Sequence, residues 1–263
     1  MSRTEIWSHG NSYLHLPNFD PMDKEMICDP NTMDSFETAA ILGVDGIEAD
    51  VSFSKDKKAI IYHPGSIYPS PLSLSLEKIN DYYPDIPSLD ELLDFLSEYP
   101  RLKCLLDMKN DSNELVGTIV KKLQATGLRD RVFLTASRRR ISLMGLYSNG
   151  EMLIYAKSLD PQIKTHIIDL FPFNMARTGR KFGADIISFG WFNNSALSKL
   201  MFNTIFEIGW KNIKEEILRA RQEGMLVFGG ITDTADDVKY FIDAGVDGIV
   251  CNNPYEAQLT RVR

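Results

Sequence analysis

Glu48 and Asp50 are two carboxylates spaced two residues apart. Both lie within the largely apolar run Gly46–Phe53. Alternate residues of a β-strand face the same side, so both carboxylates would converge on one spot if this run is a strand. Like charges that close repel each other unless a cation lies between them. Oxygen ligands of this kind suit a hard divalent ion such as Mg²⁺ or Ca²⁺. The spacing therefore predicts a metal site.

Further polar residues end the neighbouring strand-like runs of the sequence. They are His9, His63 and the pair Asp107 and Lys109, which repeats the spacing of two. In β/α barrels the active site is built where the strands end. We therefore expect three carboxylates, two imidazoles and one ammonium to gather at one rim.

The elements that must position these residues alternate along the whole chain. The predicted strands are Glu5–His9, Gly46–Phe53, Lys103–Lys109, Val132–Ala136, Met152–Ala156, Asp185–Gly190, Met225–Gly229 and Gly248–Cys251. Helical patterns are expected at Thr32–Leu42, Leu89–Glu98, Ser112–Thr126, Ile141–Tyr147, Lys211–Glu223 and Ala235–Ala244. Strands separated by helices indicate βαβ units and a parallel sheet.

Eight such strands in 263 residues favour a closed (β/α)₈ TIM barrel of the α/β class. We expect one domain over residues 1–263, since no linker-like segment divides the chain. Ala59–His63 follows a polar turn and is interpreted as an extra hairpin strand after the second strand. The stretch Phe192–Trp210 is interpreted as a short extra helix or a lid.

The composition narrows the class of protein. The net charge of −7 does not favour nucleic acid or an anionic membrane as a partner. Three scattered cysteines (Cys28, Cys104 and Cys251) lack C-x-x-C spacing and indicate buried thiols, with no disulfide framework or zinc site. The N-terminal residues lack a signal-peptide pattern, and no apolar run has the length of a membrane span, so we expect a cytoplasmic protein without stable membrane insertion.

Several segments together resemble the glycerophosphodiester phosphodiesterase family and, more distantly, the sphingomyelinase D-like phospholipases of spider venoms. The matching segments, in the family's order, are Ser8–Gly10, Asn31–Thr32, Val44–Val51, Tyr62–His63, Ile86–Glu91, Asp107–Lys109, Ala244–Ile249 and Asn253–Pro254. The resemblance implies a (β/α)₈ barrel with one divalent cation, Mg²⁺ or Ca²⁺, on Glu48, Asp50 and Asp107. It also implies acid–base catalysis by His9 and His63.

The chain departs from the family pattern around this core. Gly10 stands where the bacterial phosphodiesterases usually have a phosphate-binding arginine, and Pro30 stands where they have a glutamate. Asp107 replaces the more usual glutamate, and the resulting Asp-x-Lys is closer to the sphingomyelinase D branch. The metal and histidine residues are kept while the residues expected to grip the substrate differ.

Three residues are candidates for substrate binding. Lys109 is expected either to stabilise a phosphate oxygen or to form an ion pair with a metal-binding carboxylate. Arg138 opens a run of three arginines after the fourth predicted strand and either replaces the lost phosphate contact or is solvated. Trp191 either lines an apolar part of the pocket or packs in the core. His15 and His166 are taken as non-catalytic.

The leading hypothesis is a metal-dependent phosphodiesterase that cleaves a glycerophosphodiester, or a related phosphodiester of lipid metabolism, as a small-molecule substrate. Imidazole titrates near neutral pH, so one histidine suits the base and the other the acid. A lyase that releases a cyclic phosphate is the first alternative. A metal-dependent aldolase or isomerase and a catalytically inactive barrel that binds phosphate ligands are the others.

Overall fold

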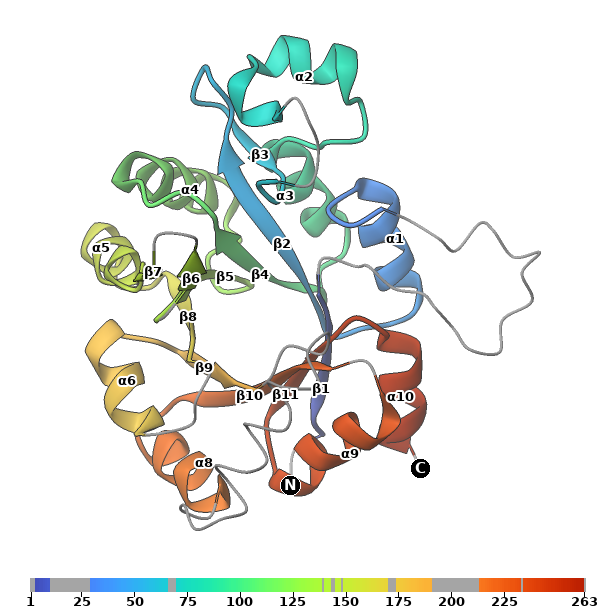
Figure 1. The fold of residues 1–263 in the computed structure, drawn as a ribbon, viewed down its shortest axis with the longest axis vertical. Helices are drawn as coiled ribbons and strands as arrows, with labels where there is room; N and C mark the ends of the chain where they lie inside the picture. The colour runs from blue at the N-terminus through green and yellow to red at the C-terminus, as the bar shows by residue number, and fades with distance from the viewer. Residues whose placement is uncertain are drawn as a thin grey trace, which may run out of the picture.

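A closed ring of eight parallel strands forms the centre of the molecule (Figure 1). The computed structural model describes residues 3–9, 29–65, 70–138, 140–142, 145–147, 149–169, 174–190, 213–232 and 234–262. The ring consists of β1 (Glu5–Ser8), β2 (Gly46–Phe53), β4 (Lys103–Met108), β5 (Val132–Ser137), β8 (Lys164–Ile168), β9 (Ile186–Phe189), β10 (Leu226–Thr232) and β11 (Gly248–Cys251). The predicted TIM barrel is therefore confirmed.

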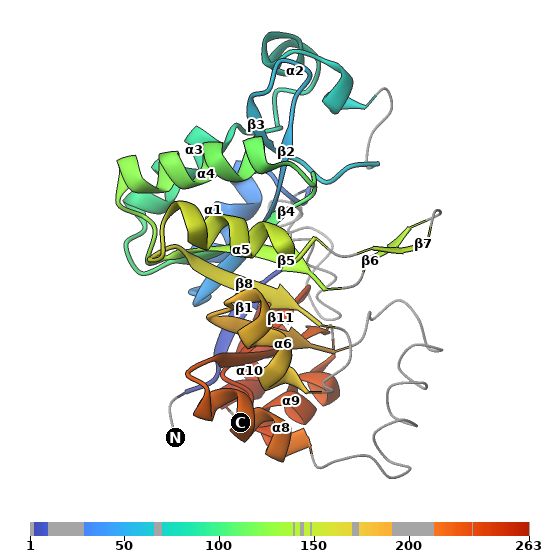
Figure 2. The same ribbon diagram turned by 90° about the vertical axis from the view of Figure 1, so that its left-hand side faces the viewer.

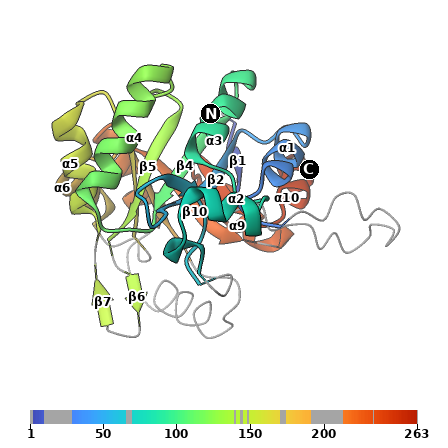
Figure 3. The ribbon, with the colours of Figure 1, turned by 90° about the horizontal axis from the view of Figure 1, so that it is seen from above.

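The first strand closes the barrel, because β1 pairs with β11 on one side and with β2 on the other. The short strand β3 (Ala59–Ile61) pairs antiparallel to β2 outside the ring, with Val51 opposite Ile61, as the predicted hairpin requires. A separate hairpin, β6 (Arg140–Ser142) with β7 (Gly145–Tyr147), follows β5. Figures 2 and 3 show it projecting from the barrel beyond the end of β5.

Helices cover the outside of the barrel in Figure 1. They are α1 (Met33–Ile41), α3 (Leu89–Glu98), α4 (Asn113–Thr126), α5 (Glu151–Leu159), α6 (Met175–Phe182), α8 (Ile213–Gln222), α9 (Ala235–Ala244) and α10 (Pro254–Val262). The short helix α2 (Leu76–Tyr82) lies beside the β2–β3 hairpin, after a turn of 3₁₀ helix at Pro71–Ser73. Among the described helices, none combines the length and the apolar character needed to cross a bilayer.

Two predicted elements are wrong. Met152–Ala156, expected as a strand, lies in helix α5, where Met152, Leu153 and Ala156 share the buried face at helical spacing. A short apolar run does not by itself distinguish a strand from a buried helix. The fifth strand of the ring is instead β8. Its alternate residues Lys164 and His166 are polar, so the sequence lacks the continuous apolar run expected of a buried strand. The helix expected at Ile141–Tyr147 is replaced by the β6–β7 hairpin.

An apolar layer fills the middle of the barrel. Its members are Trp7, Leu105, Phe133, Ile186, Phe228 and Val250. The Trp7 ring lies 5.3 Å from that of Phe228, centroid to centroid. Gly46 makes room for this indole, since a Cβ at that position would lie 2.3 Å from the Trp7 ring. This layer separates the two ends of the barrel.

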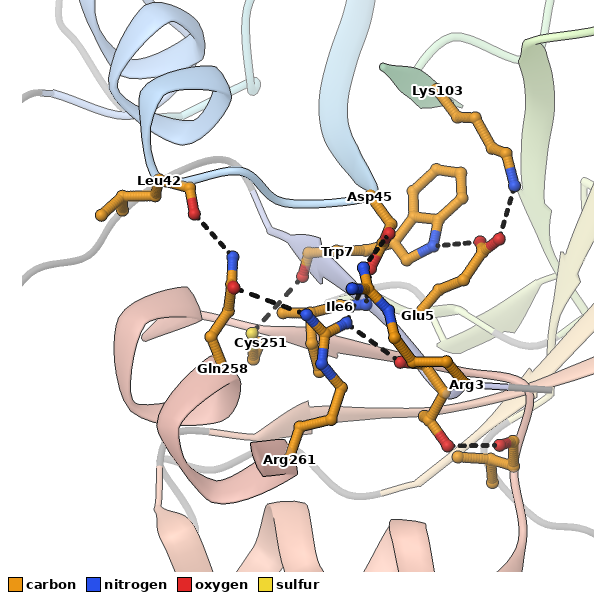
Figure 4. Close-up of polar contacts among 12 residues, drawn as sticks. Arg3, Glu5, Ile6, Trp7, Leu42, Asp45, Lys103, Cys251, Gln258 and Arg261 are labelled. Carbon is orange, nitrogen blue, oxygen red and sulfur yellow. Dashed lines mark hydrogen bonds and ion pairs between the residues drawn. The ribbon is translucent and has the colours of Figure 1, made fainter. Parts of the chain in front are cut away.

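Charged side chains close the end of the barrel where the strands begin (Figure 4). Lys103 Nζ lies 2.6 Å from Glu5 Oε1, and Glu5 Oε2 accepts a hydrogen bond from the Trp7 indole N–H. Next to them the Asp45 carboxylate accepts the Ile6 backbone N–H at 2.9 Å and pairs with Arg261 at 2.8 Å. These contacts tie β1 to the turn that enters β2. The carboxyl ends of the strands form the opposite end of the barrel.

Candidate metal and acid–base site

Three buried carboxylates meet where β2 and β4 end. Asp50 and Asp107 are register partners on these adjacent strands, and Glu48 lies two residues before Asp50 on the same face. One oxygen from each carboxylate lies within 4.8 Å of the others. All three side chains are buried, with at most 6% of each residue exposed. The expected convergence of Glu48, Asp50 and Asp107 is therefore present in the fold.

Lys109 reaches into this cluster from the end of β4. Its ammonium contacts Asp107 Oδ2 and lies 2.7 Å from Asp50 Oδ1. Burial alone would lower the pKa of Lys109, but the three carboxylates raise it above its usual value. Of the two expectations for Lys109, the structure shows the ion pair, with the carboxylates of Asp50 and Asp107.

The charges of the cluster fit a divalent cation. Three carboxylates face one ammonium, which leaves a deficit of positive charge at a buried site. Asp50 Oδ1 is buried, and among the described residues its contact is the Lys109 ammonium at 2.7 Å. Glu48, Asp50 and Asp107 offer only oxygen ligands, which suit Mg²⁺ or Ca²⁺.

His9 follows β1 on the rim beside this cluster. Its Nδ1 lies 2.8 Å from the side-chain oxygen of Asn252, so Nδ1 carries the hydrogen of the neutral ring and Nε2 keeps its lone pair. Burial lowers the pKa of His9, and the nearby Asp50 and Asn252 only partly oppose this effect. The neutral imidazole is therefore favoured near pH 7.

His63 follows β3 and is exposed to solvent. It is tied to the cluster through the hairpin, where the N–H of the preceding Tyr62 donates to the Asp50 carbonyl at 2.8 Å. Burial alone would raise the pKa of Asp50, but the charges of Lys109, His63 and His9 lower it. Both predicted histidines are thus within electrostatic reach of the same carboxylate.

Arg138 lies farther along the rim, after β5. Its Nη1 contacts the buried Asp169 carboxylate and donates to Thr178 Oγ1 at 2.9 Å, which links β5 to α6. About one third of the Arg138 side chain is exposed. Trp191, the predicted lid at Phe192–Trp210 and the side chains of Arg139 and Arg140 lie outside the described residues.

Two asparagines of the site had no role assigned from the sequence. Asn252 orients His9, and Asn31 makes two hydrogen bonds to Asp50. Asn31 stands in one of the segments that resemble the family, which was the available signal. His166 is buried in the barrel, where its ring nitrogens face Thr135 Oγ1 at 3.1 Å and Ser188 Oγ at 2.9 Å. Burial lowers the pKa of His166 to about 3, so it stays neutral.

Comparison with known proteins points to one family. The model of the glycerophosphoryl diester phosphodiesterase family matches residues 21–71. Comparison with curated proteins gives no match.

Several solved structures share the fold. A glycerophosphodiester phosphodiesterase from Parabacteroides distasonis has a TM-score of 0.73 at 16% identity, over 99% of this chain and 97% of that one. The enzyme of the same name from Thermotoga maritima has a TM-score of 0.68 at 14% identity, over 100% of both chains. An Oleispira antarctica phosphodiesterase, solved with the product sn-glycerol-3-phosphate, has a TM-score of 0.70 at 15% identity, over 99% and 98%.

The first match lies in sequence, over residues 21–71, and the others show a shared fold. The resemblance predicted from the sequence is thereby confirmed: residues 21–71 carry the sequence pattern of the glycerophosphodiester phosphodiesterase family, on a barrel with the fold of solved proteins that bear its name.

Proposed function

We propose that this chain is a metal-dependent phosphodiesterase that cleaves a glycerophosphodiester or a related phospholipid-derived phosphodiester. One observation carries the proposal: Glu48, Asp50 and Asp107 bring oxygens within 4.8 Å of one another beside His9 and His63. A divalent ion on these carboxylates supplies positive charge that polarises a phosphate oxygen. We also propose a cytoplasmic location.

His9 is assigned as the general base and His63 as the general acid. With Nδ1–H held by Asn252, the Nε2 lone pair of His9 is the one that accepts a proton from the attacking oxygen. His63, at the exposed rim, donates a proton to the leaving alcohol. The bond to the attacking oxygen forms as the bond from phosphorus to the leaving oxygen breaks.

Two cations are assigned to the phosphate. Lys109 lies between two of the carboxylates, and its ammonium would be free to contact a phosphate oxygen if a divalent ion were held by Glu48, Asp50 and Asp107. Arg138 is the second, because about a third of its side chain is exposed and its described contacts engage Nη1 alone. Trp191 is assigned to the apolar part of the substrate.

The alternative product is a cyclic phosphate, formed when a hydroxyl of the substrate attacks in place of water. The Asp107-x-Lys109 pattern and the glycine at position 10 favour this alternative. Phosphorus NMR of the product separates the two, because a cyclic phosphodiester and a phosphomonoester differ in chemical shift.

The test is turnover of a panel of glycerophosphodiesters and lysophospholipids by the wild-type protein, with EDTA and with Mg²⁺ or Ca²⁺ added back. We expect EDTA to abolish turnover and one of the ions to restore it. Replacing His9 or His63 by alanine should lower kcat by about 10²–10⁴-fold. Asp243→Asn, at an exposed helix position, is the control and should keep full activity. Inactivity on the whole panel despite a bound ion would favour the phosphate-binding barrel.

A further inference from the structure

Asn31 makes two hydrogen bonds to Asp50. Its side-chain oxygen accepts the backbone N–H of Asp50 at 2.9 Å, and its side-chain nitrogen donates to Asp50 Oδ2 at 2.9 Å. Only 7% of Asn31 is exposed, so water competes little with these bonds. The amide thus fixes both the strand position and the rotation of the Asp50 carboxylate.

These hydrogen bonds give the two carboxylate oxygens of Asp50 different partners. Oδ2 is occupied by the Asn31 amide, while Oδ1 faces the position held by the Lys109 ammonium, 2.7 Å away. The Asn31 N–H engages one lone pair of Oδ2, so turning both oxygens toward a cation would strain this bond. Asp50 therefore offers one oxygen to a cation in this arrangement.

Asparagine suits this position for two reasons. Its backbone has φ +63°, in the left-handed region where asparagine is enriched. Its amide is both donor and acceptor, as the two bonds to Asp50 require. The next residue, Thr32, caps helix α1 through a reciprocal pair of hydrogen bonds with Ser35, so Asn31 is anchored to a packed helix.

We propose that Asn31 is a positioning residue that holds Asp50 as a one-oxygen ligand and thereby favours Mg²⁺ over Ca²⁺. Ca²⁺ takes six to eight oxygens in flexible arrangements that often include both oxygens of a carboxylate, whereas Mg²⁺ requires a near-octahedral set. A carboxylate free to turn would suit the larger ion. This inference rests on the proposed metal-dependent function and deepens it.

The test is calorimetric titration of the metal-free protein with Mg²⁺ and, separately, with Ca²⁺. The variant is Asn31→Gly, because glycine accepts the positive φ without strain. We expect Mg²⁺ affinity to fall by about 10–100-fold, the usual effect of removing a group that orients a metal ligand. The affinity for Ca²⁺ should fall less, so the Mg²⁺/Ca²⁺ preference declines.

Asn149→Ala is the matched control. Asn149 is also a buried asparagine with two hydrogen bonds, but its partners are the backbone groups of Ser137 and Met108. It should lose stability and keep both ion affinities. If Asn31→Gly does not fold, Asn31→Asp retains the acceptor, loses the donor to Oδ2 and should show the same shift toward Ca²⁺.

If the wild-type protein binds neither ion, the proposed metal-dependent function is wrong. If the wild type binds an ion and the Asn31 variants bind both ions as the wild type does, or lose both equally, the function stands and the role of Asn31 is overturned.

Discussion

At the scale of single residues, the site depends on side chains that orient other side chains. Asn252 fixes the tautomer of His9, and Asn31 fixes the rotation of Asp50. His9 and Asn252 are 243 positions apart in the chain, and Asn31 and Asp50 are 19 apart. Their effect is measurable in the pH dependence of the reaction.

Substitution of Asn252 should shift the pH at which kcat/KM falls on the acid side of its pH profile, the acid limb. A base works only when unprotonated, and burial lowers the pKa of His9 from 6.5, so activity should fall only as the pH drops below that value. Asn252→Asp places a carboxylate beside Nδ1 and should raise the limb by about one pH unit or more. Asn252→Ala removes a contact that raises the pKa and should lower the limb.

The neighbouring Asn253 supplies the control for this profile. It caps helix α10 through the Glu256 N–H, with no histidine among its described contacts, so Asn253→Ala should leave the acid limb in place. A limb that stays fixed in both Asn252 variants would show that His9 is not the base.

The residues that could be predicted are those whose spacing along a strand carries the signal. Glu48 with Asp50, and Asp107 with Lys109, were found because alternate strand residues share a face. The role of Asn31 could not be found this way, since its bonds to Asp50 depend on a left-handed backbone and on the packing of α1 beside β2.

At the scale of elements, three turns that enter strands share one construction. Asp45, Asp185 and Asp247 each precede a strand, and each carboxylate accepts a backbone N–H from the strand before it in the chain. Each also pairs with at least one Arg or Lys side chain. The same construction therefore joins β1 to β2, β8 to β9 and β10 to β11. These turns lie at the end of the barrel opposite the site.

Helices and strands were predicted correctly where their hydrophobic patterns differ. The predictions were wrong where a short apolar run fits either element. The Val44–Asp45–Gly46 turn marked β2 clearly, as did its counterpart before β11. Around β8 the sequence carried little signal, because its inward residues are polar: His166 bonds Thr135 and Ser188 inside the barrel. Such partners exist only in the folded ring.

Asp185→Asn should destabilise the protein in a pH-dependent way. Burial alone would raise the pKa of Asp185, but Lys157, the Thr165 N–H and Lys164 hold it below its usual value. A lowered folded-state pKa gives stability that is present above the unfolded-state pKa and is lost as the pH falls through the folded-state pKa. We expect the variant to lose about 1–2 kcal/mol of unfolding free energy at pH 7, since its ion pairs are partly exposed.

Denaturant unfolding at pH 7 and near pH 3 measures this difference. The gap between Asp185→Asn and the wild type should narrow at the lower pH, where the wild-type carboxylate begins to lose its charge. Asp243→Asn, whose partner Lys239 is exposed on the same helix, should differ little from the wild type at either pH. A gap that does not change with pH would rule out the ion pairs as its cause.

At the scale of the whole molecule, the two ends of the barrel differ. One end contains ion pairs that stabilise the fold, and the other contains an excess of negative charge. The apolar layer around Trp7 and Phe228 lies between the Glu5–Lys103 pair and the carboxylates of Glu48, Asp50 and Asp107. Among the described residues, the Lys109 ammonium contacts two of these carboxylates, Asp50 and Asp107. The stability of the whole barrel should therefore depend on which cation, Lys109 or a divalent ion, balances the cluster.

Lys109→Met tests this dependence through global unfolding. Removing one partner of a buried ion pair typically costs about 3–5 kcal/mol, so the metal-free variant should unfold at a clearly lower temperature than the wild type. An ion at one hundred times its Kd stabilises the folded state by about 2.7 kcal/mol. If Lys109 and the ion compete for Asp50 and Asp107, the variant binds the ion more tightly and its Tm rises more than that of the wild type.

Calorimetric melting with EDTA and then with excess Mg²⁺ or Ca²⁺ measures the rise in Tm of both proteins. Lys239→Met, at an exposed ion pair, is the control and should match the wild type. Equal rises in Lys109→Met and the wild type would mean that the ammonium and the ion do not share these carboxylates.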